Sequence, residues 1–147
     1  AERIGGKVTE YDITQHAPDA YITAGPEDLL IVGVPVYAGR IPAGSSEALG
    51  KFKTDGAPAI ITCVYGNRDY DDALLELKDT AEANGFRVVS AGAFIARHSI
   101  FPEVGTDRPD KKDMDFIDHF AEKSAEIIRS VVDTETLADI KVKGNHP

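Results

Sequence analysis

The sequence predicts a single α/β domain built on a parallel sheet, and three observations lead to that prediction. Near-continuous apolar runs occur at residues 28–37, 59–65 and 86–96, as in strands that are buried on both faces of a parallel sheet. A segment with helical spacing of apolar residues follows each run, and glycine or proline marks the boundaries. Because parallel crossovers are right-handed, the helices should cover both faces and give three α/β/α layers.

The first 25 residues predict a helix end, a short strand and a loop. Residues 1–4, followed by Gly5 and Gly6, have the pattern of a last helical turn with its C-cap, where glycine adopts the left-handed conformation. Residues 7–13 alternate between polar and apolar side chains, which predicts a strand. Residues 14–25 are rich in turn formers and predict a connection.

The middle of the chain predicts two strands with a helix between them. The strand over residues 28–37 is followed by Pro42, which suits the first position of a helix. Leu49 and Phe52 then fit the inward face of that helix, which the sequence at 56–58 should end. The second strand is predicted over residues 59–65.

The C-terminal half predicts a helix, a strand, a loop and a long helix. Asp69 is a suitable N-cap for a helix over residues 70–84, with Asp72 in its first turn. A strand at 86–96 and a loop at 97–109 precede a helix that begins near Asp113. The inward stripe of this last helix is predicted to be Phe116, Phe120, Ser124, Ile127 and Val131, with Ile117 and Ile128 beside it.

Composition excludes several classes of function. The chain has 147 residues, of which 42% are hydrophobic and 28% charged, as in a folded domain. A net charge of −9 makes nucleic acid an unsuitable partner, because phosphate backbones require a basic surface. No apolar run reaches the roughly 20 residues that span a membrane, and no signal-peptide pattern opens the chain. Cys63 is the only cysteine, which fits the reducing cytoplasm and excludes a four-cysteine cluster within this chain.

Three loops are predicted to meet at one rim, because ligands of open parallel sheets bind beyond the carboxyl ends of the strands. These loops are VYAGRIP at 36–42, YGNRDY at 65–70 and RHS at 97–99. Gly66 permits close approach or a positive φ, and Asn67 tolerates the left-handed region. Such a loop can offer N–H groups to a planar, carbonyl-rich ligand. The same loop also fits an ordinary strand-to-helix turn.

Other side chains at this rim allow more than one role. Tyr37 and Tyr70 could lay their rings against a ligand. Arg40 could bind an anion, or could pair with one of the many surface carboxylates. His98 could donate a proton or a hydrogen bond, or could serve the fold alone.

The motifs of several enzyme classes are absent. The sequence contains no GxSxG, GxxxxGK[ST], HExxH or GxGxxG pattern. Cys63 lies within an apolar strand and is predicted to be an inert core residue. The aspartates at positions 69, 71 and 72 are interpreted as helix-capping charges rather than as a metal or phosphoacceptor site.

Four blocks of sequence resemble a microbial flavodoxin-like family, whose members are often fused to a C-terminal ferredoxin module with two four-iron clusters. The blocks are DLLIVGVPVYAGRIP, VYGNRDYDDALLELKD, GFRVVSAGAFIARHSIFP and RPDKKDMDFIDHF, in that order. The resemblance runs from about residue 1 to residue 146. It implies a flavodoxin-like domain over residues 1–136 and a linker over 137–147, where KVKGNHP is similar to the segment that leads into the ferredoxin part.

The resemblance also implies a parallel sheet of order 2-1-3-4-5 that binds FMN. The implied cofactor-binding residues are Pro35, Val36, Tyr37, Ala38, Gly39, Arg40, Tyr65, Gly66, Asn67, Arg68, Tyr70 and His98. Family members hold the FMN phosphate in a loop such as FSGTGNT after the first strand, and no such motif occurs here. We therefore expect that the first strand and the phosphate loop are missing, and that this chain alone binds FMN weakly or not at all.

A missing first strand would leave a slot about 10 Å wide in the sheet, at about 4.8 Å per strand. We expect a preceding segment to fill it, and residues 137–142 are a less favoured candidate. Three functions are consistent with the sequence. The first is an FMN-dependent electron carrier, or oxidoreductase component, whose partner is a ferredoxin-type iron–sulfur module. The second is a flavin-free binding or regulatory module, and the third is a reductase with His98 as proton donor.

Overall fold

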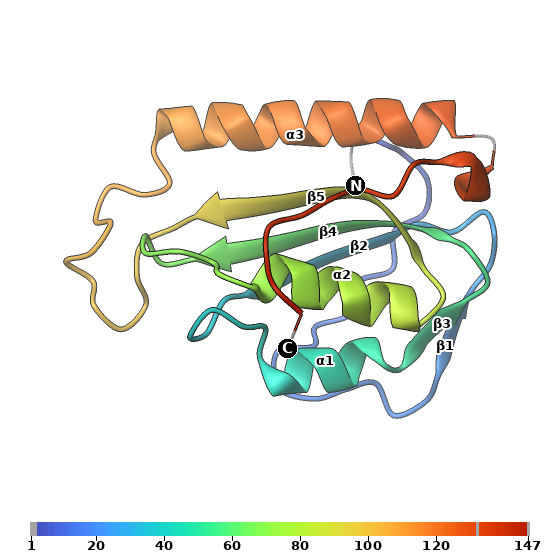
Figure 1. Ribbon diagram of the computed structural model, residues 1–147, viewed down its shortest axis with the longest axis horizontal. Helices are drawn as coiled ribbons and strands as arrows, with labels where there is room; N and C mark the ends of the chain where they lie inside the picture. The colour runs from blue at the N-terminus through green and yellow to red at the C-terminus, as the bar shows by residue number, and fades with distance from the viewer. Residues whose placement is uncertain (1–2, 132, 147) are drawn as a thin grey trace.

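Helices lie on both sides of a parallel sheet in the computed structural model, which describes residues 3–131 and 133–146 (Figure 1). The elements in chain order are β1 (Ile22–Ala24), β2 (Leu30–Pro35), α1 (Ala43–Leu49), β3 (Phe52–Thr54), β4 (Pro58–Tyr65), α2 (Ala73–Ala83), β5 (Arg87–Ile95), α3 (Lys111–Ser130) and the 3₁₀ turn η1 (Thr134–Thr136). The predicted α/β class with parallel strands is confirmed.

The main sheet has the order β2-β4-β5, and β4 lies at its centre. All pairing is parallel, and the register places Val34 opposite Cys63 and Cys63 opposite Ala93. The ladder shifts between Ala59 and Ile60. Because the central strand has a neighbour on each edge and helices over it, most of its apolar side chains are buried, as the sequence predicted, although Val64 is 42% exposed. The same prediction is wrong for β2, which alternates buried and exposed residues because it lies at the edge of the described sheet.

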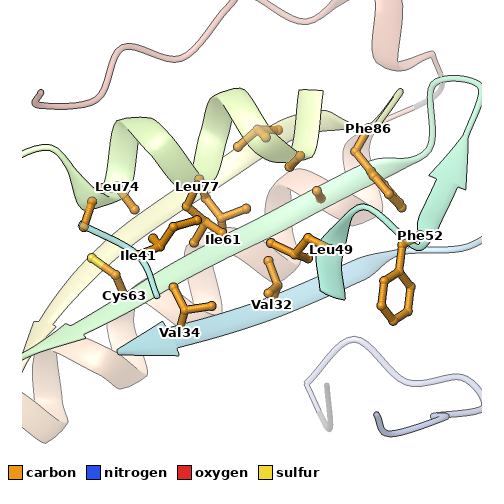
Figure 2. Packing of buried hydrophobic residues seen from close by; sticks show 14 of the residues in the cluster. Val32, Val34, Ile41, Leu49, Phe52, Ile61, Cys63, Leu74, Leu77 and Phe86 are labelled. Carbon is orange, nitrogen blue, oxygen red and sulfur yellow. The ribbon is translucent and has the colours of Figure 1, made fainter. Parts of the chain in front are cut away.

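The core lies between this sheet and helices α1 and α2. Leu74 and Leu77 point from α2 toward Ile61 and Cys63 of β4, as Figure 2 shows. Ile61, Cys63 and Leu77 are completely buried. Their burial follows from the two sequence periods, because the strand directs every second side chain, and the helix every third or fourth, to the same layer.

Helix α3 covers the opposite face of β5. The hydroxyl groups of Ser90 and Ser124 are 2.6 Å apart, and the rings of Phe94 and Phe120 meet edge to face at 5.2 Å. The helix starts two residues earlier than predicted. Asp110 caps it by accepting the N–H of Asp113, whose side chain accepts the N–H of Asp110 in return.

The predicted inward stripe of α3 is wrong at Phe116. This side chain is 60% exposed, because Phe120 takes the position against β5, with its ring 5.2 Å from that of Phe94, and the Phe116 ring lies farther out, at 6.1 Å. Ser124 is buried as predicted, next to Ala125, which the stripe did not include.

The prediction of a strand at residues 7–13 is also wrong. These residues form no ladder, although Tyr11 packs edge to face on Phe52 at 5.2 Å. A small strand, β1, forms instead inside the predicted connection and pairs with β3. Phe52 therefore belongs to a strand and not to the first helix, which ends at Gly50, where the N–H bonds back to Ser46.

Helix α2 begins at Ala73, with Asp72 rather than Asp69 at the N-cap. The Asp69 carboxylate instead accepts the N–H groups of Tyr70 at 2.7 Å and Asp71 at 3.2 Å. The predicted cap is wrong because the chain makes an extra turn before the helix, and Asp69 stabilises that turn.

Gly5 and Gly6 have φ values of 81° and 93°, the left-handed conformation expected of a helix C-cap. Of the helix end predicted there, residues 1 and 2 lie outside the described residues, and residues 3–4 form a turn.

One edge of the main sheet is open. Among the described strands, β2 pairs only with β4, and β1 and β3 form a separate pair. Ile31 and Val64 lie on the same face of the sheet as α3, but beyond the part that this helix covers, and they are 44% and 42% exposed. The expected slot, the preceding segment expected to fill it and the order 2-1-3-4-5 stay predictions. The less favoured candidate for that place, residues 137–142, forms no strand and instead contacts α2 and the core cluster.

Candidate functional site

The three predicted loops do meet at the carboxyl end of the sheet. The carbonyl of Gly39 accepts the N–H of Asp72 at 3.1 Å, which joins the first loop to the second. A Cβ atom on Gly66 would lie 2.9 Å from Cδ2 of His98, so the second loop touches the third. The rim of the sheet is therefore one continuous surface, as expected from parallel strands.

The first loop is a tight turn between Tyr37 and Arg40. Each of these two residues donates its N–H to the carbonyl of the other, at 2.9 and 3.0 Å. Ala38 and Gly39 between them have φ values of 50° and 80°, as in a type I′ turn. The positive φ of Ala38 is uncommon for a residue with a Cβ atom. Tyr37 projects outward and is 62% exposed.

The second loop is also built from unusual backbone. Asn67 has φ 67°, in agreement with the prediction, and Asp71 has φ 43°. Gly66 serves close approach rather than a positive φ, because His98 occupies the space that a side chain would need. Backbone in such sparsely populated regions concentrates at ligand-binding sites.

Six N–H groups on these two loops donate no hydrogen bond to any described residue, those of Ala38, Gly39, Gly66, Asn67, Arg68 and Asp69. Four of them belong to the glycines of the two turns and the residues beside them: Ala38, Gly39, Gly66 and Asn67. A ligand that carries several carbonyl oxygens on a flat ring could accept from them. The neighbouring open cavity, of about 520 Å³, is lined by three carboxylates, Asp69, Asp71 and Asp72, and by two cations, Arg40 and Lys143. The excess of carboxylates disfavours a phosphate group there.

Arg40 pairs with carboxylates, which was the second of its two predicted roles. Its Nε lies 3.0 Å from Oε2 of Glu76, and its Nη1 lies 3.9 Å from Asp72. Glu76 also accepts the N–H of Ile41 at 3.0 Å. Arg68 forms a similar ion pair with Asp71.

The ring of Tyr70 is in contact with other side chains of the protein. Its ring lies 5.5 Å from that of Tyr65, and Nζ of Lys143 lies 4.9 Å above it. Burial raises the pKa of the Tyr70 hydroxyl. Tyr37 is thus an aromatic side chain at this rim that remains exposed, whereas Tyr65 and Tyr70 contact each other.

His98 has a defined tautomer. Its Nδ1 accepts the N–H groups of Ile100 and Phe101, both at 3.1 Å, so this nitrogen carries no proton. The proton is then on Nε2. Acting as an acid would require an imidazolium, whose Nδ1–H would face these two donors. The geometry favours a hydrogen-bonding role and argues against His98 as a proton donor.

The remaining predicted positions have structural roles at the strand ends. Val36 extends the ladder by donating to Val64 at 2.9 Å, and Pro35 ends strand β2 at the open edge. Burial raises the pKa of the Cys63 thiol to about 12, which agrees with an inert core residue.

Lys143 is the residue at this rim that sequence reasoning missed. Its Nζ lies 2.7 and 2.6 Å from the two carboxylate oxygens of Asp69. This contact lowers the pKa of Asp69 and raises that of Lys143. No local signal could have revealed it, because the two residues are far apart in the chain and Lys143 lies in the predicted linker.

No group of three or more acidic, histidine or cysteine side chains within the described ranges is arranged to hold a metal ion. In the same part of the chain, none of the helices has the length and apolar character needed to cross a membrane. Comparison of the chain with protein-family models, curated proteins and solved structures finds no match.

Proposed function

We propose that this chain is a flavodoxin-like electron-transfer domain that binds the flavin ring of FMN at the rim formed by residues 36–40 and 65–70. The free N–H groups of Ala38, Gly39, Gly66 and Asn67 are the observation that carries the proposal. Bound FMN would supply the chemistry, because flavins take up and release electrons one or two at a time.

The residues of the chain have distinct parts in this proposal. The four N–H groups orient the carbonyl edge of the ring, and Tyr37 covers one of its faces. The Nε2–H of His98 donates a further hydrogen bond. A ferredoxin-type iron–sulfur module is the proposed redox partner, and the lone, buried Cys63 is compatible with a reducing cytoplasm.

Flavin titration tests the proposal. Because the proposed contacts hold the ring and not the phosphate, FMN and riboflavin should bind this chain with similar Kd values, in the range of about 10 μM to 1 mM. The measurement is quenching of flavin fluorescence. Tyr37→Ala should weaken binding about tenfold, the loss of roughly one stacking contact.

Tyr21→Ala is a matched control, because Tyr21 is 68% exposed, similar to Tyr37, and directly precedes β1, far from the rim. Equal effects of the two changes would overturn the ring site. Absence of any flavin binding up to about 1 mM would favour the second candidate, a flavin-free binding or regulatory module.

A further inference from the structure

The C-terminal segment, residues 137–146, lies along helix α2 (Figure 1). Asp139 forms an ion pair with Lys78 at 2.9 Å, and Ile140 and Val142 pack against the core cluster. At the far end, the ring of His146 lies 2.9 Å from Asp79. The segment is therefore attached at several points of one helix.

Close packing specifies the path of this segment at Gly144. Its φ is 146°, and a Cβ atom there would lie 2.6 Å from Cβ of Leu75. Only glycine lets the chain pass at this distance. The residues on either side of Gly144 contact the rim. The N–H of Asn145 donates to Asp72 at 2.9 Å, and Lys143 contacts Asp69.

Through Asp69, Lys143 is connected to the second loop, which carries the free N–H groups of Gly66 and Asn67. Lys143 binds both oxygens of Asp69, and the same carboxylate holds the N–H groups of Tyr70 and Asp71. The ammonium group also lies over the Tyr70 ring. One lysine thus contacts both side chains that shape the turn after Asn67.

We propose that Lys143 is a positioning residue of the candidate site, and that the segment 137–146 is a strap that holds the loop 66–71 in its strained conformation. The identity of the ligand rests on the proposed function, but the conformation of the loop can be measured on the ligand-free chain. The positive φ values of Asn67 and Asp71 require such support, because strained backbone persists only where its surroundings specify it.

Amide hydrogen exchange, measured by NMR on the ligand-free chain, tests the strap. Lys143→Met should speed exchange at Tyr70 and Asp71 about fivefold and shift the amide signals of Gly66 and Asn67. Lys143→Arg should keep the wild-type pattern, because guanidinium also binds a carboxylate and stacks on an aromatic ring. Asp69→Asn should reproduce the effect of Lys143→Met.

Lys141→Met is the matched control, because Lys141 is exposed on the same segment and outside the Asp69 contact. If Lys143→Met leaves the loop signals unchanged, or if Lys141→Met shifts them equally, the strap is overturned. If the loop responds as expected but no variant binds flavin, the strap stands and the proposed function falls. If flavin binds but the loop signals do not respond to Lys143→Met, the proposed function stands and the strap falls.

Discussion

The middle of strand β4 and the loop just past its carboxyl end are built in opposite ways. In the middle of the strand, Ile61 and Cys63 are fully buried under Leu77. Just past its carboxyl end, Gly66 and Asn67 carry free N–H groups, and Asn67 adopts a positive φ. The difference shows that the stabilising core and the candidate site occupy separate positions along one strand, so substitutions in the two regions should have different consequences.

The largest effect is expected in the core. Leu77→Ala should lower the free energy of unfolding by about 2–5 kcal/mol, because it removes a fully buried side chain and leaves a cavity. Urea denaturation measures this. Met114→Ala, at a side chain that is 47% exposed, should change it by less than about 0.5 kcal/mol. Equal losses at both sites would contradict the core described here.

A smaller loss of stability is expected at the rim. Gly66→Ala should cost about 1–3 kcal/mol, because the new methyl group would meet His98 and force one of the two to shift. Flavin affinity should fall at the same time. Gly44→Ala is a control with the opposite sign, since nothing lies within 4 Å of that position in α1 and alanine favours a helix by about 0.5–1 kcal/mol.

Burial of the Cys63 thiol in the core should make the free energy of unfolding depend on pH in the alkaline range. Its folded pKa is raised from 9.0 to about 12, so its contribution to stability is complete below pH 9. As the pH rises from there toward 12, the unfolded thiol ionises first and stability falls by about 1.4 kcal/mol per pH unit. The difference between wild type and Cys63→Ala isolates this slope from other titrating groups. Identical slopes would contradict it.

Alkylation provides a second measurement on the same residue. At pH 8 the native chain should react very slowly with iodoacetamide, and urea should expose the thiol to rapid reaction.

The smallest effect is expected at Asn67. Asn67→Gly should leave stability within about 1 kcal/mol of wild type, because glycine adopts φ 67° without strain but gains entropy when unfolded. Asn67→Val should lower it by about 1 kcal/mol or more, because a β-branched residue is strained there. Thermal unfolding measures both. A valine that is tolerated as well as glycine would show that the loop relaxes freely.

Much of the fold could be predicted because its signals are local. The apolar runs of β2, β4 and β5 and the punctuation around them appear within short windows of sequence. The strand predicted at residues 7–13 failed for a physical reason. Alternation of polar and apolar side chains makes a segment suitable for a sheet, but it does not provide a strand to pair with. In the folded chain β1 pairs with β3, and residues 7–13 pair with no described strand.

At the candidate site, residue types at the strand ends predicted the meeting of three loops and the left-handed Asn67. The tertiary structure decided which side chains remain open to a ligand. It engaged Arg40 with Glu76 and Tyr70 with Lys143, and it left Tyr37 exposed.

The sequence by itself determined the α/β class, the positions of the three longer parallel strands and the positions of the rim loops, because each depends on periodicity and turn chemistry within a few residues. Only the tertiary structure decided the pairing of β1 with β3, the tautomer of His98 and the contact of Lys143 with Asp69. These depend on groups that the folded chain brings together from distant positions, and no local pattern records such distances.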